Sequence, residues 1–167
     1  IFTMVGTGQE VRDVYFSDSG LFGADIKGKL FIDMGTTAPS LTAEIAAFCD
    51  QHDAASIDAP VSGGDVGARA ATLSIIAGGR DKDIEKVSGL FACLGTLMHL
   101  GGHGSGQHGK VCNQITVAGT MIGICEALVY AARAGLDRDR LIAAISTGAA
   151  GCWALDKLAP RIVEQDY

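Results

Sequence analysis

One segment carries the strongest signal for chemistry: residues 100–114, LGGHGSGQHGKVCNQ. Its glycines allow the backbone to approach a ligand closely, and they lead to Lys110, which we place in the first turn of a long apolar helix. The helix dipole disfavours a cation at that end, and a lysine whose pKa is lowered can exchange a proton near neutral pH. Asn113 and Gln114 are polar amides about one turn further on, where they would contact a ligand. The simpler interpretation is a glycine-rich turn with a solvated lysine.

The same segment also matches other patterns. Residues 104–109 fit the dinucleotide fingerprint G-x-G-x-x-G, but the predicted helix continues where that fingerprint requires a second strand. Residues 104–110 fit the P-loop pattern G-x-x-x-x-G-K, but Val111 stands where a Ser or Thr must hold Mg²⁺. Four side chains are of zinc-ligand type: His99, His103, His108 and Cys112. Their spacing fits no usual zinc pattern, so we expect no metal site.

A second candidate site is the loop DAPVSGG, residues 58–64. An apolar strand is expected at 55–59, and the loop follows its carboxyl end, where open α/β sheets bind ligands. The backbone N–H groups of Ser62, Gly63 and Gly64, together with the serine hydroxyl, can form a cradle for a carboxylate. A plain turn is the alternative.

A third candidate is the sequence DMGTTAP, residues 33–39, again a strand end that leads into a helix. Thr36 or Thr37 is a natural N-cap residue for that helix. Either hydroxyl is also placed to contact a cofactor ribose or amide.

Strands and helices alternate over the first hundred residues, which predicts an α/β layer with a largely parallel sheet. The expected strands are 1–5, 29–34, 55–59, 72–77 and 96–100, and the expected helices are 9–16, one beginning near 36–40, and 81–94. The remainder is predicted to be helical, at 110–134, 137–145 and 152–163. The first of these three is apolar on most faces, so we expect it to be buried between domains or subunits.

Composition excludes some classes of partner. The net charge is −6 and there is no run of Lys or Arg, so we expect neither nucleic acid nor an anionic membrane surface as partner. The most apolar stretch, 111–125, contains two amide side chains and is too short to span a bilayer. The five cysteines are odd in number and far apart, which favours a reducing, cytoplasmic compartment over a disulfide framework.

Taken together, residues 58–64 and 102–114 resemble the substrate-binding and catalytic motifs of the 3-hydroxyisobutyrate dehydrogenase (β-hydroxyacid dehydrogenase) family. Residues 1–5 (IFTMV) and 31–39 (FIDMGTTAP) resemble the fourth and fifth strands of its Rossmann domain. The resemblance covers essentially the whole chain. The stretch 62–69 (SGGDVGAR) is also similar to 6-phosphogluconate dehydrogenase, a related enzyme.

The resemblance implies an α/β fold in two parts: the C-terminal portion of a Rossmann-like NAD(P)-binding domain over 1–106, then the start of an all-α domain over 107–167, led by a long interdomain helix. The family's N-terminal βαβ unit with G-x-G-x-x-G, and its distal helices, have no counterpart here. We therefore expect a fragment that is inactive by itself, and a full-length homo-oligomer joined through the helical domain.

The resemblance also implies a role for each motif. Ser62, Gly63 and Gly64 hold the substrate carboxylate, and Lys110 is the general acid/base. Asn113 and Gln114 orient the reacting group, although many members carry Asn four residues after the lysine, so either amide is a candidate to face the substrate.

By the same resemblance, Thr36 or Thr37 contacts the nicotinamide side of NAD or NADP. The implied function is hydride transfer between NAD(P) and a short 3-hydroxycarboxylate, either 3-hydroxyisobutyrate or 2-hydroxy-3-oxopropionate (tartronate semialdehyde). The rival hypothesis is a non-catalytic dinucleotide-sensing or oligomerisation module on the same fold.

The enzyme hypothesis makes a geometric prediction. Lys110 and the Ser62 loop should converge at the carboxyl edge of one sheet, with the ammonium facing the Ser62–Gly63 backbone across a cleft. A structure that places them on opposite faces of the domain would contradict the site.

Overall fold

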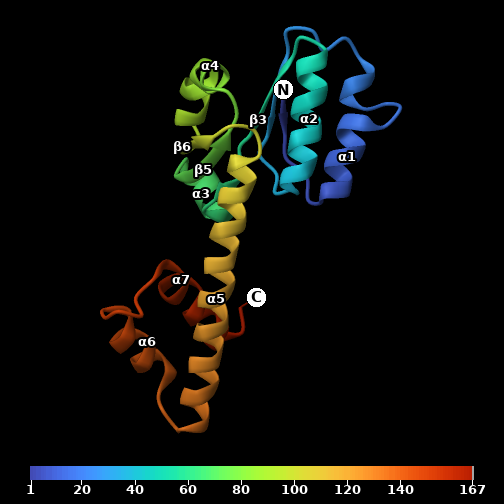
Figure 1. Cartoon of the computed structure of the whole chain (residues 1–167). Helices are drawn as coiled ribbons and strands as arrows, with labels where there is room; N and C mark the ends of the chain where they lie inside the picture. Colours follow the sequence, from blue (N-terminus) through green and yellow to red (C-terminus); the bar gives the residue numbers. More distant parts are fainter. Residues whose placement is uncertain (167) are drawn as a thin grey trace. The chain divides into compact units, whose positions relative to one another are not determined.

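The computed structural model describes residues 1–166 (Figure 1). They form two compact units, of which the first is Ile1–Cys112 and the second begins at Asn113. The first unit contains β1 (Phe2–Thr3), α1 (Gly8–Phe16), η1 (Leu21–Gly23), β2 (Leu30–Asp33), α2 (Pro39–Gln51), β3 (Ala55–Asp58), β4 (Val61–Ser62), α3 (Gly64–Ala70), β5 (Leu73–Gly78), α4 (Asp81–Ala92) and β6 (Gly95–Gly101). Helix α5 (Ser105–Arg133) begins in the first unit and ends in the second, which adds α6 (Arg138–Ser146) and α7 (Trp153–Glu164). The domain boundary expected after residue 106 stays a prediction.

The first unit is built on a six-stranded sheet, and the predicted α/β class with a parallel sheet is confirmed. Strands β1, β2 and β3 are parallel, as are β5 and β6. The two parallel groups run in opposite directions, because β3 and β5 meet in an antiparallel pair at Asp58 and Gly78. Strand β4 adds antiparallel to β5, so the loop after β3 returns along the same sheet.

Alternating side chains of β2 explain how helices cover both faces of the sheet. Phe31 belongs to a buried cluster with residues of α1 and α2, including Tyr15 and Ile45. Its neighbour Ile32 belongs to a different buried cluster, which contains Ile75 of β5 and residues of α4. Strand β2 is therefore fixed from both sides, and so is the loop that follows its carboxyl end.

The start of α5 differs from the prediction. The helix begins at Ser105, so Lys110 lies in its second turn rather than its first. Two glycines of the segment, Gly106 and Gly109, lie within the helix and let α5 approach the sheet. A Cβ on Gly106 would lie 2.5 Å from the carbonyl oxygen of Ile76 and 2.6 Å from that of Asp58. Sequence periodicity does not reveal this packing, because the contacts are made by strands that are distant in the chain.

Two further local predictions are wrong. Ala38 is the N-cap of α2 and Pro39 is its first residue, so neither Thr36 nor Thr37 caps that helix. Residues 64–70, which had no predicted helix, form α3. Here small residues follow two glycines of positive φ, and such sequences have weak helix signals.

Much of helix α5 is exposed within the described residues, so its expected burial between domains or subunits stays a prediction. Several of its apolar side chains are exposed: Val111, Ile115, Val117, Ile122, Val129 and Tyr130. The helix has 29 residues, and the mean hydropathy of its most apolar window is 1.7, so by length and composition it is able to cross a membrane. This corrects the view that the apolar stretch is too short, although a single helix of this kind is weak evidence for a membrane protein.

The close approach at Gly106 predicts a large difference between two substitutions in the same helix. Gly106→Ala should destabilise the chain by roughly 1–3 kcal/mol, because its Cβ overlaps backbone oxygens that cannot rotate away. Gly119→Ala is the matched control: its Cβ meets nothing within 4 Å, and it should stabilise the helix by about 0.5–1 kcal/mol. Urea unfolding of the three proteins measures both effects, and equal stabilities would contradict the packing.

Candidate active site

The start of α5 is capped by a carboxylate from another strand. The Asp58 Oδ1 atom accepts a hydrogen bond from the Gly104 N–H at 2.8 Å, and Oδ2 accepts one from the Gln107 N–H at 2.9 Å. Gly104 directly precedes α5 and Gln107 lies in its first turn, where N–H groups have no acceptor within the helix. Burial raises the pKa of Asp58, and the two backbone N–H groups oppose the rise. The end of β3 is thereby tied to the beginning of α5.

Gln107 ties the same helix turn to the end of β2. Its side chain is fully buried. The amide nitrogen Nε2 donates to the Gly35 carbonyl at 2.9 Å, and Oε1 accepts from the Thr37 N–H at 3.1 Å. Both polar groups of the side chain bond to backbone groups, and these bonds offset the cost of burying the amide.

Lys110 lies close to the Ser62 loop, as the sequence predicts, but it bonds directly to the residue before Ser62 and does not face the loop across a cleft. The Lys110 side chain is buried, and its Nζ donates to the Val61 carbonyl at 2.8 Å. Val61 immediately precedes Ser62 in β4. Burial lowers the pKa of Lys110. The expected direction of the shift is therefore found, but its cause is loss of solvent and not a position in the first helical turn.

The Ser62–Gly64 loop offers an open backbone next to that lysine. Ser62 is half-buried and is paired with Ser74 in the β4–β5 ladder. Gly63 and Gly64 lie beyond the ladder, are exposed, and have φ of 130° and 63°, which favour glycine. The two glycines are thus the part of the loop whose backbone is accessible to a ligand.

The other predicted site residues divide into two groups. Thr36 is exposed beside the end of β2, whereas Thr37 is buried and its Oγ1 has no hydrogen-bond partner among the described residues. Asn113 is half-buried and Gln114 exposed on α5, three and four residues after Lys110 and within the second unit. The roles of all four stay predictions.

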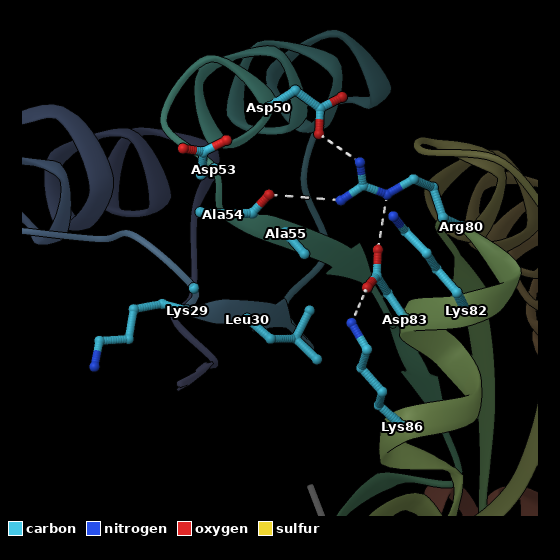
Figure 2. Close-up of a pocket in the computed structure, with 11 residues that line it drawn as sticks. Lys29, Leu30, Asp50, Asp53, Ala54, Ala55, Arg80, Lys82, Asp83 and Lys86 are labelled. Carbon is cyan, nitrogen blue, oxygen red and sulfur yellow. Dashed lines mark hydrogen bonds and ion pairs between the residues drawn. The ribbon is translucent and has the colours of Figure 1, made fainter.

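A cavity lies elsewhere, at the amino ends of β2 and β3 (Figure 2). It has a volume of about 400 Å³, and several of the charged side chains that line it pair with one another. The buried Asp83 carboxylate accepts hydrogen bonds from Arg80 Nε at 2.7 Å and Lys86 Nζ at 2.9 Å, and Arg80 also binds Asp50. We interpret this network as structural. In residues 1–166, no group of three or more His, Cys, Asp or Glu side chains is placed to hold a metal ion.

Two residues of the site had no predicted role. Asp58 was part of the 58–64 motif, and Gln107 was part of the glycine-rich segment, but neither was singled out. An acidic residue at a strand end is the signal that could have identified the cap. Nothing in the sequence indicates that the helix begins at Ser105, so the contact between Asp58 and the start of that helix could not be predicted.

Comparison with known families agrees with this fold. Residues 1–113 match the model described as the NAD binding domain of 6-phosphogluconate dehydrogenase. Residues 104–167 match the model described as the NAD-binding region of NADP-dependent 3-hydroxyisobutyrate dehydrogenase. The two matches overlap across the first turns of α5.

Individual relatives point the same way. An uncharacterized oxidoreductase of Bacillus subtilis is 42% identical over the whole chain and 58% of its own length, and the 2-hydroxy-3-oxopropionate reductase of Escherichia coli is 39% identical over the same shares. A solved 3-hydroxyisobutyrate dehydrogenase of Mycobacterium tuberculosis, with L-serine, is 35% identical with a TM-score of 0.81, over 95% of this chain and 54% of that one. The chain spans about half the length of the relatives it matches.

The fold and the matched models define the class as nicotinamide-dinucleotide-binding oxidoreductases, whose cofactor is NAD or NADP. Within that class, the chain belongs to the 3-hydroxyisobutyrate dehydrogenase (β-hydroxyacid dehydrogenase) family. The resemblance drawn from its motifs is thereby confirmed.

The ion pairs of Asp83 predict a stability that depends on pH. Burial raises the pKa of Asp83, but its bonds with Lys86 and Arg80 outweigh burial and leave the pKa below its ordinary value. A lowered carboxyl pKa stabilises the fold above the unfolded-state value and loses that effect as the pH falls through the folded-state value. Asp83→Asn should therefore cost roughly 1–3 kcal/mol at pH 7 and much less below about pH 3.

Thermal unfolding of the chain and of Asp83→Asn between pH 7 and pH 3 measures this difference. The control is Asp65→Asn, whose exposed carboxylate lies 3.9 Å from Arg69 and should contribute little at any pH. A gap between the chain and Asp83→Asn that stays constant with pH would show that the ion pairs are not its origin.

Proposed function

We propose that the full-length protein containing this chain is an NAD(P)-dependent dehydrogenase of short 3-hydroxycarboxylates, with Lys110 as its general acid/base. The observation that carries the proposal is the bond from the buried Lys110 Nζ to the Val61 carbonyl, at 2.8 Å. It brings the lysine to the strand that leads directly into the Ser62–Gly64 loop. A proton-transfer group and a carboxylate cradle then share one edge of the sheet.

Lys110 is suited to move a proton. Its lowered pKa makes the neutral amine more accessible than in a solvated lysine, since burial disfavours the ammonium form. When the substrate is oxidised, Nζ accepts the hydroxyl proton; when the carbonyl is reduced, the ammonium donates it back. The Val61 carbonyl accepts one of the ammonium hydrogens and so fixes the direction of the others.

The loop after β4 is suited to hold the substrate carboxylate. Gly63 and Gly64 present an exposed backbone, and the half-buried Ser62 adds a hydroxyl. Hydrogen bonds to both carboxylate oxygens would set the distance between the reacting hydroxyl and Lys110. In this proposal Asn113 or Gln114 orients the reacting carbon, as the family motif implies.

The loop after β2 supplies contacts for the dinucleotide. The exposed Thr36 hydroxyl fits a ribose or an amide, whereas the Thr37 Oγ1 is buried and has no hydrogen-bond partner among the described residues, so Thr36 is the stronger candidate of the two. The nicotinamide, when bound, exchanges the hydride with the substrate. NAD and NADP are both accommodated by the proposal.

The substrate class follows from the shared chemistry of the relatives. The Escherichia coli relative is named a 2-hydroxy-3-oxopropionate reductase, and the Mycobacterium tuberculosis structure is a 3-hydroxyisobutyrate dehydrogenase solved with L-serine. Each of these compounds has a carboxylate and an oxygen function on the third carbon. We propose 3-hydroxyisobutyrate or 2-hydroxy-3-oxopropionate as the substrate.

We also propose a homo-oligomer that covers the exposed apolar face of α5. That face carries Ile115, Ile122 and Val129 at intervals of seven residues, a spacing that suits packing against another helix. The absence of membrane and nucleic-acid partners and the cytoplasmic location stay predictions from composition.

The role of Lys110 is tested by two substitutions in the full-length protein. Lys110→Ala should lower kcat by roughly 10²–10⁴-fold, the usual range for positioned proton transfer. Lys110→Arg should recover little of the rate, because a guanidinium keeps the charge but does not release its proton at working pH. Steady-state rates with both candidate substrates and with NAD and NADP provide the measurement, and the pH profile of the Ala variant should lose one limb.

The control is Lys82→Ala, an exposed lysine at the cavity of Figure 2, which should leave kcat unchanged. Recovery of most of the rate by Lys110→Arg would make the lysine a charge anchor for the carboxylate and would refute its acid/base role.

A further inference from the structure

A single side chain grips the loop after β2 on both sides of Thr36. Gln107 Nε2 donates to the carbonyl of the residue before it, Gly35, at 2.9 Å. Gln107 Oε1 accepts from the N–H of the residue after it, Thr37, at 3.1 Å. A single hydrogen bond would leave the loop free to rotate about that bond. Two bonds from one planar amide remove this freedom and so fix both the position and the orientation of Thr36.

The grip determines which threonine faces outward. Gly35 and Thr37, the two residues that Gln107 holds, are buried, whereas Thr36 between them is exposed. The Gln107 side chain itself is fully buried, so water cannot replace either bond without opening the helix–loop contact. The Thr36 hydroxyl is therefore presented by a rigid backbone.

The same helix turn is held independently from β3. Asp58 Oδ2 accepts from the backbone N–H of Gln107 at 2.9 Å. Lys110 follows Gln107 by three residues on α5, and its Nζ bonds to Val61. Gln107 thus stands between the loop that carries Thr36 and the helix turn that carries the proposed proton-transfer group.

We propose that Gln107 is a positioning residue for the dinucleotide: it sets the loop of Thr36 at a fixed distance from Lys110, so that cofactor and proton-transfer group are aligned. This role rests on the proposed function. Gln107 acts through the backbone of Gly35 and Thr37 and does not itself touch the reacting atoms.

Two variants of the full-length protein separate alignment from packing. Gln107→Met keeps the length of the side chain and loses both hydrogen bonds. Gln107→Glu keeps the acceptor toward the Thr37 N–H, and its carboxyl, when protonated, regains a donor toward the Gly35 carbonyl. Burial and the nearby carboxylates of Asp58 and Asp33 favour that protonated form. The control is Gln51→Met, a glutamine exposed at the end of α2.

The measurements are NADH and NADPH affinity by fluorescence titration, and kcat and KM for the hydroxyacid, well below the unfolding temperature. Gln107→Met should weaken dinucleotide affinity by about tenfold, corresponding to roughly one net hydrogen bond, and should lower kcat while the KM for the hydroxyacid changes little. The limb of the pH profile assigned to Lys110 should persist. Gln107→Glu should return to wild-type affinity as the pH is lowered, and Gln107→Met should not.

The outcomes are distinct. Wild-type dinucleotide affinity in Gln107→Met, or equal losses in Gln107→Met and Gln107→Glu at every pH, would overturn the positioning role and leave the proposed function intact. A wild-type protein that neither binds a dinucleotide nor turns over a hydroxyacid would overturn the proposed function, and this role with it. A reduced unfolding temperature without a change in affinity would show that Gln107 only packs.

Discussion

A buried carboxylate between β3 and α5 is the interaction on which the site depends. Asp58 accepts hydrogen bonds from the Gly104 and Gln107 N–H groups, which have no acceptor within the helix. Its negative charge also lies at the positive end of a 29-residue helix. Because loss of solvent alone raises the pKa of Asp58, these contacts are what stabilise the charged form. The first turn of α5 therefore has one favourable position relative to the strand ends.

Close packing makes that position precise. Gly106 brings the helix backbone against Ile76 and Asp58 at a distance that no larger residue allows. With the turn fixed there, Gln107 reaches the loop after β2 and Lys110 reaches β4. Each of these interactions therefore depends on the one before. The Asp58 cap fixes the position of the first turn of α5, that position places Lys110 against β4, and burial there lowers the pKa of Lys110.

Sequence reasoning succeeded where the general topology of an α/β sheet determines the outcome. Lys110 and the Ser62 loop were expected to converge because strand ends of an α/β sheet gather at one edge, and they do. It failed where distant residues decide. The start of α5 depends on Asp58, which lies 46 residues before Gly104. The apolar face of α5 is exposed within the chain. A sequence pattern does not distinguish apolar side chains that pack in the core of the same unit from those that could pack against another surface.

The most direct test is hydrogen exchange at the Gly104 and Gln107 amides, measured by NMR in the chain and in Asp58→Ala. If the carboxylate holds the start of α5, both amides are protected in the chain and exchange rapidly in the variant. The Ile76 amide, which bonds to the Pro60 carbonyl at 2.9 Å, should stay protected in both and so exclude global unfolding. Unchanged exchange at Gly104 and Gln107 in Asp58→Ala would contradict the account.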